Sequence, residues 1–143
     1  MTKLTKSIHV KAPVEDVYNF LYEPENQVEI WPSLIEIKNV QKLPNGGNKY
    51  TWVYKMAGMR FEGKGEDIEV IPYKRLTSKN EGGIDSTVSW LFEAQNDGTL
   101  VTAETEYKVP VPLLGKLAEN IIVKQNEREA EVILANLKAH MEG

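Results

Sequence analysis

Apolar residues alternate with polar ones along much of the first 107 residues of the chain. Alternation of this kind is typical of β-strands that bury one face. The pattern predicts strands over residues 3–11, 33–43, 49–57, 59–71, 74–80, 88–93 and 101–107. Glycine-containing segments between several of them, at 44–48, 57–58, 81–83 and 96–98, predict turns. Because successive hairpins pair strands in opposite directions, we expect one antiparallel sheet of six or seven strands.

The stretch 49–57 gives the clearest strand pattern. Its large residues share one face: Tyr50, Trp52, Tyr54 and Met56. If residues 57 and 58 form the whole turn into the next strand, Trp52 lies opposite Gly63, a familiar cross-strand arrangement of an aromatic ring and a glycine. Gly63 and Gly65 also remove volume from the predicted inner face, which favours an open space there. Beyond Gly65 the alternation shifts, which predicts a β-bulge.

Three segments have helical character instead. Residues 13–22 and 25–30 form two short helices, which end at Pro24 and Pro32 because the residue before a proline avoids the helical region. A long helix is predicted from Leu113 to Met141, since this stretch contains good helix formers and no proline. At ~1.5 Å per residue it would be about 40 Å long. One long helix beside a sheet with one apolar face predicts an α+β fold in which the sheet curls around the helix.

A polar patch interrupts the apolar stripe of this long helix. Stepping about 100° per residue places apolar side chains in one stripe: Leu114, Leu117, Ala118, Ile121, Val132 and Ala139. Gln125 projects onto the centre of the stripe, with Arg128 and Glu129 on either side. Two interpretations remain open: the patch holds the polar part of a molecule beneath the helix, or it marks a wide mouth where the helix meets water.

Composition narrows the classes of function. The 143 residues suit a single domain over 1–143, with no cysteine and only two histidines, so neither a metal site nor a cofactor is expected. The net charge is −4 and no basic run is present, so nucleic acid is not an expected partner. No apolar run approaches the ~20 residues of a membrane span, and residues 1–10 lack the apolar stretch of a signal peptide. We therefore expect a cytoplasmic protein without an integral membrane segment.

Several stretches resemble those of a known family. They are KAPVEDVY at 11–18, PEN at 24–26 with IWPSL at 30–34, DGT at 97–99 with Tyr107, and 112–138 from PLLG onward. On these stretches the chain resembles the START-like superfamily, also called SRPBCC, and within it the polyketide cyclase/dehydratase-like or coenzyme-Q-binding-like branch. The resemblance implies the helix-grip fold: a curved antiparallel sheet wrapped around a long C-terminal helix, with two short helices between strands 1 and 2. It also implies a cavity for apolar ligands between sheet and helix, in which some members perform chemistry.

We expect the ligand-binding residues to come from the inner face of the sheet and from the helix: Trp52, Tyr54, Met56, Phe61, Gly63, Trp90, Tyr107, Ile121, Gln125, Arg128 and Glu129. Large residues at alternating positions also pack cores, so core packing is the competing interpretation of the aromatic positions.

Three functional hypotheses follow. The first is a binding protein, monomeric or weakly homodimeric, for a small apolar molecule such as a lipid, an isoprenoid quinone, a polyketide or a similar ring compound. The second is a cyclase- or dehydratase-type enzyme in which Arg128, Glu129 and Tyr54 are the candidates for proton transfer. The third, which the resemblance implies, is a protein-interaction module of the chaperone-activator type, which would show an exposed apolar patch and little cavity. The sequence leaves open whether any reaction is catalysed.

Overall fold

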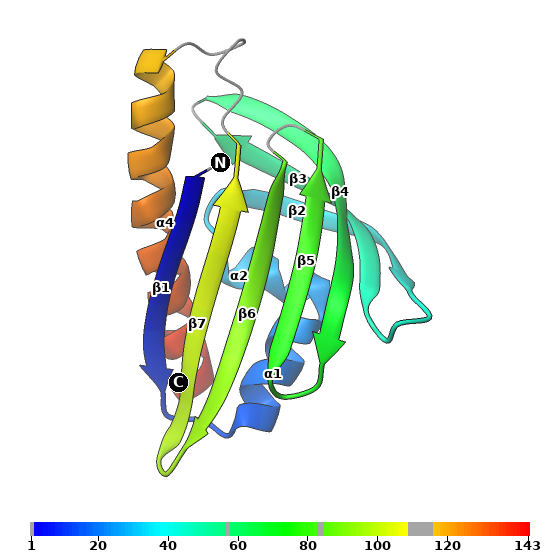
Figure 1. The fold of residues 1–143 in the computed structure, drawn as a ribbon, viewed down its shortest axis with the longest axis vertical. Helices are drawn as coiled ribbons and strands as arrows, with labels where there is room; N and C mark the ends of the chain where they lie inside the picture. The colour runs from blue at the N-terminus through cyan, green and yellow to red at the C-terminus, as the bar shows by residue number, and fades with distance from the viewer. Residues whose placement is uncertain (1, 57, 83–84, 109–115) are drawn as a thin grey trace.

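The predicted hairpins pair to form one curved sheet (Figure 1). The computed structural model describes residues 2–56, 58–82, 85–108 and 116–143. In chain order the elements are β1 (Thr2–Val10), α1 (Val14–Tyr22), a 3-10 turn η1 (Pro24–Asn26), α2 (Gln27–Ile30), β2 (Leu34–Lys42), β3 (Asn48–Met56), β4 (Met59–Ile71), β5 (Arg75–Glu81), β6 (Ser86–Gln95), β7 (Gly98–Tyr107) and α4 (Lys116–Glu142). Within the described residues the seven strands follow the order β1-β7-β6-β5-β4-β3-β2 and every pair is antiparallel. The predicted α+β helix-grip architecture is confirmed.

The register of the β3–β4 hairpin is the predicted one, with Trp52 opposite Gly63 and Tyr50 opposite Gly65. A Cβ atom on Gly63 would lie 2.5 Å from Cζ2 of Trp52, and one on Gly65 would lie 2.5 Å from Cε2 of Tyr50. The two aromatic rings therefore lie over the two glycines. The expectation that these glycines leave an open space was wrong, because the rings already fill it.

Register shifts in β2 and β4 decide which side chains face inward. The register of β2 shifts between Leu34 and Glu36, which leaves Ile35 44% exposed. The predicted shift in β4 falls between Asp67 and Glu69. Asp67 is buried in phase with Gly63 and Gly65, the next two residues, Ile68 and Glu69, are both exposed, and Val70 then turns inward. Each register shift therefore reverses the faces that simple alternation assigns.

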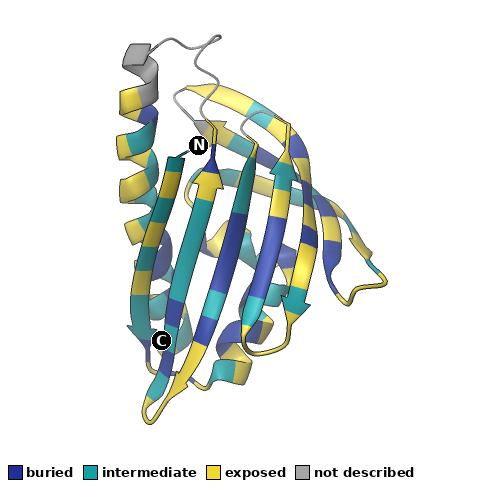
Figure 2. Ribbon diagram, in the orientation of Figure 1, coloured by how far each residue is buried: buried dark blue, intermediate teal, exposed yellow. Residues whose placement is uncertain are grey.

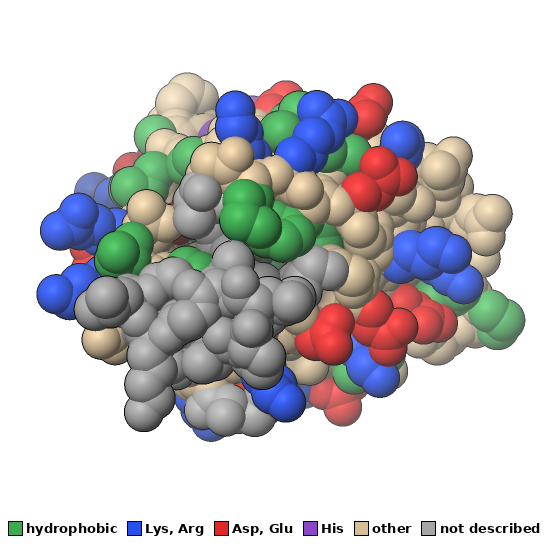
Figure 3. Space-filling view, turned by 90° about the horizontal axis from the view of Figure 1, so that it is seen from above, with side chains coloured by type: hydrophobic (Ala, Val, Ile, Leu, Met, Phe, Trp, Pro, Cys, Tyr) green, Lys and Arg blue, Asp and Glu red, His purple; other side chains and the backbone are tan. Residues whose placement is uncertain are grey.

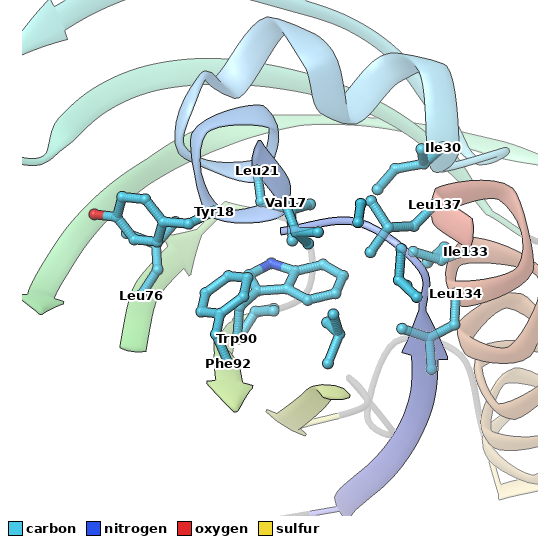
Figure 4. Packing of buried hydrophobic residues seen from close by; sticks show 14 residues of the cluster. Val17, Tyr18, Leu21, Ile30, Leu76, Trp90, Phe92, Ile133, Leu134 and Leu137 are labelled. Carbon is cyan, nitrogen blue, oxygen red and sulfur yellow. The ribbon is translucent and has the colours of Figure 1, made fainter. Parts of the chain in front are cut away.

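The main core lies where α1, α2 and the last turns of α4 meet the sheet. Figure 4 shows Trp90 of β6 among Val17 and Leu21 of α1 and Ile133 and Leu137 of α4. Buried positions run along the central strands β5 and β6 (Figure 2). Burial of each large apolar side chain contributes roughly 1.5–3 kcal/mol. This cluster fixes one end of the long helix against the sheet.

The helix α4 buries a different face from the predicted one. Ile133, Leu134 and Leu137 are buried, whereas Ile121 is 56% and Val132 is 44% exposed. The chain carries two apolar stripes about one residue apart, and the stripe with the bulkier residues near the C-terminus is the one that packs, because it removes more apolar area from water. The predicted first turn at 113–115 lies outside the described residues.

The close contact between Trp52 and Gly63 generates a stability prediction. The variant Gly63→Ala should lower the free energy of unfolding by about 1–3 kcal/mol, because the added methyl group meets the Trp52 ring and the carbonyl oxygens of Glu81 and Gly82. Urea unfolding measures the change. Lys64→Ala, at the exposed neighbouring position, is the control and should stay within about 0.5 kcal/mol of the parent. Equal stability of Gly63→Ala and the parent would contradict the packing described for this hairpin.

Candidate ligand-binding cavity

A cavity of about 140 Å³ lies between the inner face of the sheet and α4. Its walls include a set of aromatic residues from the end of α2 and from β3, β6 and β7: Trp31, Tyr50, Trp52, Tyr54, Trp90 and Tyr107. Seen from the end of the molecule at which α4 begins, apolar side chains lie near the middle and charged ones toward the edge (Figure 3). The aromatic residues thus form a wall of the cavity as well as part of the core.

Small side chains opposite these rings account for the space. Ala103 and Thr105 occupy inward positions of β7, and Ala130 faces the cavity from α4. Larger residues at these positions would meet the aromatic wall and close the cavity. The packed cluster of Trp90 and Ile133 bounds one end, and the smaller cluster of Tyr107 with Tyr54 bounds the other.

A carboxylate on α4 reaches the cavity wall. The Tyr54 hydroxyl donates a hydrogen bond to Oε1 of Glu129 at 3.3 Å, and the backbone N–H of Ser33 donates one to Oε2 at 2.8 Å. Glu129 therefore ties α4 to the chain just before β2 and presents an acceptor beside a phenol. Burial, and next the negative charge of Glu129, raise the pKa of Tyr54 well above its ordinary value of 10.0. The phenol remains protonated at neutral pH.

Three buried hydrogen-bond donors of cavity residues have no partner among the described residues: Nε1 of Trp31, Nε1 of Trp52 and the hydroxyl of Tyr107. Burial raises the pKa of Tyr107, and a hydrogen-bonding interaction with the side-chain amide of Asn126 lowers it. A group that lowers the pKa of a phenol donates toward its oxygen, so this amide does not supply the acceptor that the hydroxyl lacks. Most buried polar groups in proteins are satisfied, and an unsatisfied one costs roughly 1–3 kcal/mol. Three such donors around one cavity distinguish it from an ordinary packed core.

A second polar cluster supports the opposite side of the cavity. The carboxylate of Asp67 is 3% exposed and accepts hydrogen bonds from Ser78 Oγ at 2.6 Å and from the Asn48 N–H at 2.8 Å. Burial raises the pKa of Asp67. Burial and the charge of Asp67 raise the pKa of Tyr50 to about 12, against hydrogen bonds to Ser78 and Gln27 that lower it. Asp67 therefore holds one cavity residue, Ser78, in place by a hydrogen bond and acts on a second, Tyr50, through its charge.

The predicted site residues separate into two groups. The cavity wall contains Trp52, Tyr54, Trp90, Tyr107 and Glu129. Phe61 packs beside Tyr54 in the small cluster and Gly63 lies under Trp52, so neither lines the cavity. The side chain of Met56 lies outside the described part of the chain.

The remaining predicted residues, Ile121, Gln125 and Arg128, are exposed. Their predicted inward orientation was wrong because α4 presents the adjacent face to the sheet. That face brings in Asn126 and Ala130, which the assumed helix phase excluded. The exposed position of Arg128 removes it from the candidates for proton transfer in the cavity.

Neither histidine lies at the cavity. Nε2 of His9 is hydrogen-bonded to Oδ1 of Asp97 at 2.9 Å, and the exposed His140 lies 3.5 Å from Glu29. Within the described ranges, no three His, Cys, Asp or Glu side chains gather as a metal ion would require. No helix in the same residues is long and apolar enough to cross a membrane.

An antiparallel sheet gripping one long helix over an aromatic cavity is the architecture of a helix-grip protein. The chain belongs to the family described as polyketide cyclase / dehydrase and lipid transport, whose model matches residues 1–142. None of the curated proteins matches the sequence.

Solved structures share the fold at low sequence identity. TTHA0849 from Thermus thermophilus has 20% identity and a TM-score of 0.85, over 98% of this chain and 97% of the other. The di-domain ARO/CYC StfQ from the steffimycin biosynthetic pathway has 17% identity and a TM-score of 0.78, over 98% of this chain and 50% of the other. The Zhui aromatase/cyclase from Streptomyces sp. R1128 has 12% identity and a TM-score of 0.76, over 99% of this chain and 93% of the other. At these identities the likeness shows a common fold.

The buried Asp67 generates a prediction for the pH dependence of stability. Its folded pKa is raised above the ordinary 3.8. The contribution of Asp67 to the free energy of unfolding is therefore largest below the pKa of this group in the unfolded chain. It is lost as pH rises through the pKa of the group in the folded protein. As pH rises from about 4, the free energy of unfolding of the parent should fall relative to that of Asp67→Asn. Urea unfolding from about pH 4 to 7 measures this difference, and the exposed Glu66→Gln is the control. A constant difference would show that Asp67 titrates as an ordinary carboxyl group.

Proposed function

We propose that the protein binds a small, largely apolar molecule, such as a lipid, an isoprenoid quinone, a polyketide or a similar ring compound, between the sheet and α4. The observation that carries this proposal is the aromatic-walled cavity of about 140 Å³. An apolar cavity of about 150 Å³ in another protein binds benzene. The space therefore suits one ring or an equivalent part of a longer molecule.

The chemistry of the lining supports the same class of ligand. Leu34, Ile37, Val88 and Ile133 supply apolar surface, and the aromatic rings offer faces for stacking or edge contacts. A few polar groups, among them Glu129, break the apolar wall. A mostly apolar cavity with a few fixed polar groups is typical of small-molecule sites. A protein-interaction module would have little cavity, so this lined cavity argues against that hypothesis.

Filling the cavity from the helix tests this proposal. Ala130→Leu should weaken binding of ethylbenzene, a single-ring probe, by about tenfold or more, because the added side chain occupies the space that the probe needs. Ala135→Leu makes the same change on the exposed side of α4 and should leave the affinity unchanged. Titration calorimetry or ligand-detected NMR gives the affinities, and native mass spectrometry of freshly purified parent protein reveals any co-purifying molecule. No binding to the folded parent, or equal binding to both variants, would refute a pocket at this place.

A second function, an enzyme of the cyclase or dehydratase type, is favoured by the pairing of Tyr54 with Glu129. A carboxylate can accept a proton from a carbon next to a carbonyl group, and a phenol can donate a hydrogen bond to the oxygen that gains charge. Glu129 would serve as the base and Tyr54 as the donor. The relatives described as aromatase/cyclases make this reaction class a concrete alternative.

Glu129→Gln separates the two functions. Glutamine keeps an acceptor for the N–H of Ser33 but is a far weaker base, so an enzyme should lose at least about a hundredfold in turnover while ligand binding and fold persist. Turnover is measured by mass spectrometry on a co-purifying ligand or on a poly-β-ketone substrate. Glu131→Gln, exposed on the same helix, is the control. Unchanged turnover in Glu129→Gln would exclude the base role.

A further inference from the structure

Three residues of the cavity lining carry buried hydrogen-bond donors that the described part of the chain does not satisfy. Tyr107 is 2% and Trp52 is 8% exposed, and both carry donors without a partner among the described residues. Nε1 of Trp31 is in the same situation. Glu129, the carboxylate of the lining, already receives hydrogen bonds from Tyr54 and Ser33. What is lacking is therefore an acceptor that the chain itself does not provide.

The cavity lining contains a negatively charged side chain but no positively charged one among the described residues. Among the described residues that line the cavity, Glu129 is the acidic one, and none is lysine, arginine or histidine. The neighbouring Arg128 is exposed and does not line the cavity. A carboxylate or phosphate placed beside Glu129 would meet a like charge in a region of reduced dielectric, without a cation to offset it. An uncharged acceptor avoids this repulsion.

We propose that the cavity selects an uncharged ligand bearing a carbonyl-type oxygen over an anionic ligand of the same shape. Tyr107 and Trp52 donate hydrogen bonds to that oxygen, and Glu129 disfavours the anion. This inference rests on the proposed binding function and deepens it: among the candidate ligands, ketones, quinones and lactones fit, whereas fatty-acid carboxylates and phosphate head groups do not. It holds whether the protein only binds the molecule or also transforms it.

The test uses three single-ring probes of similar size: ethylbenzene without an acceptor, acetophenone with a neutral carbonyl group, and benzoate as the anion. The quantity compared is the ratio of two affinities for one protein, because this ratio removes effects on the apolar part of the site. Tyr107→Phe and Trp52→Phe each retain a ring and remove a donor. Each should lower the affinity for acetophenone about fivefold relative to ethylbenzene. Glu129→Gln should raise the affinity for benzoate about tenfold or more relative to ethylbenzene.

Tyr22→Phe is the matched control, because it removes a hydroxyl outside the cavity lining that already donates a hydrogen bond to the carbonyl oxygen of Gly46. It should leave the acetophenone-to-ethylbenzene ratio within twofold of the parent's, by the same measurement. Thermal unfolding adds an independent readout. Tyr107→Phe should raise the parent's melting temperature, since it removes a buried hydroxyl without a partner, whereas Tyr22→Phe should lower it because a hydrogen bond is lost.

The outcomes separate this inference from the binding function. Ethylbenzene binding with unchanged probe ratios in both Tyr107→Phe and Trp52→Phe would overturn the donor role while the apolar pocket stands. Benzoate that binds the parent as tightly as acetophenone would overturn the charge selection. If none of the three probes binds the folded parent, the proposed function fails and this inference fails with it.

Discussion

One long helix, helped only at one end by the short α1 and α2, has to cover the inner face of a strongly curved sheet, and the rest of the structure depends on how it does so. The C-terminal half of α4 packs Ile133, Leu134 and Leu137 into the main core. Farther toward its N-terminus, Ile122 packs against Tyr107. Between these two contacts the helix spans a concave surface that its own side chains do not fill. The cavity is thus a result of the geometry that holds the helix, rather than of a separate element built to enclose a ligand.

Glu129 occupies the middle of that span and has two roles that are physically linked. The hydrogen bond that Glu129 accepts from Ser33 helps to fix α4 to the segment just before β2. Its other oxygen accepts a hydrogen bond from the phenol of Tyr54. The same bonds that hold the carboxylate also determine where its charge acts. On the opposite side, Asp67 holds Ser78 through a buried hydrogen bond and shifts the pKa of Tyr50. Carboxylates therefore support the cavity from both sides, but only Glu129 lines it.

Much of the fold follows from the sequence because local patterns determine it. The predicted register of Trp52 opposite Gly63 is the observed one, and the single phase of alternation in β6 correctly indicates that Val88, Trp90 and Phe92 are buried. The site was harder to predict, because α4 carries two apolar stripes about one residue apart. Which stripe packs depends on contacts with α1 and the sheet, which no local pattern contains. The sequence pattern consequently predicts an inward position for Ile121, Gln125 and Arg128, and it does not indicate Asn126.

The cavity itself left a weaker signal in the sequence than its walls. Large alternating aromatics are visible as a pattern, but the space opposite them depends on small residues, Ala103 and Ala130, that are common everywhere in proteins. The glycines that suggested a gap are instead covered by Trp52 and Tyr50. Only three-dimensional pairing of large with small side chains distinguishes a filled core from a hollow one.

The unpaired donors bear on the competition between stability and binding. At position 107 a phenylalanine ring would occupy the same place without a buried hydroxyl that lacks a partner, and would remove a cost of roughly 1–3 kcal/mol. Sequences depart from the most stable choice chiefly at functional sites. Trp52 departs in the same way, and both residues border the same cavity as the carboxylate of Glu129. A packed core gives no reason for such departures to coincide with a carboxylate at one cavity, whereas a ligand that brings its own acceptor does.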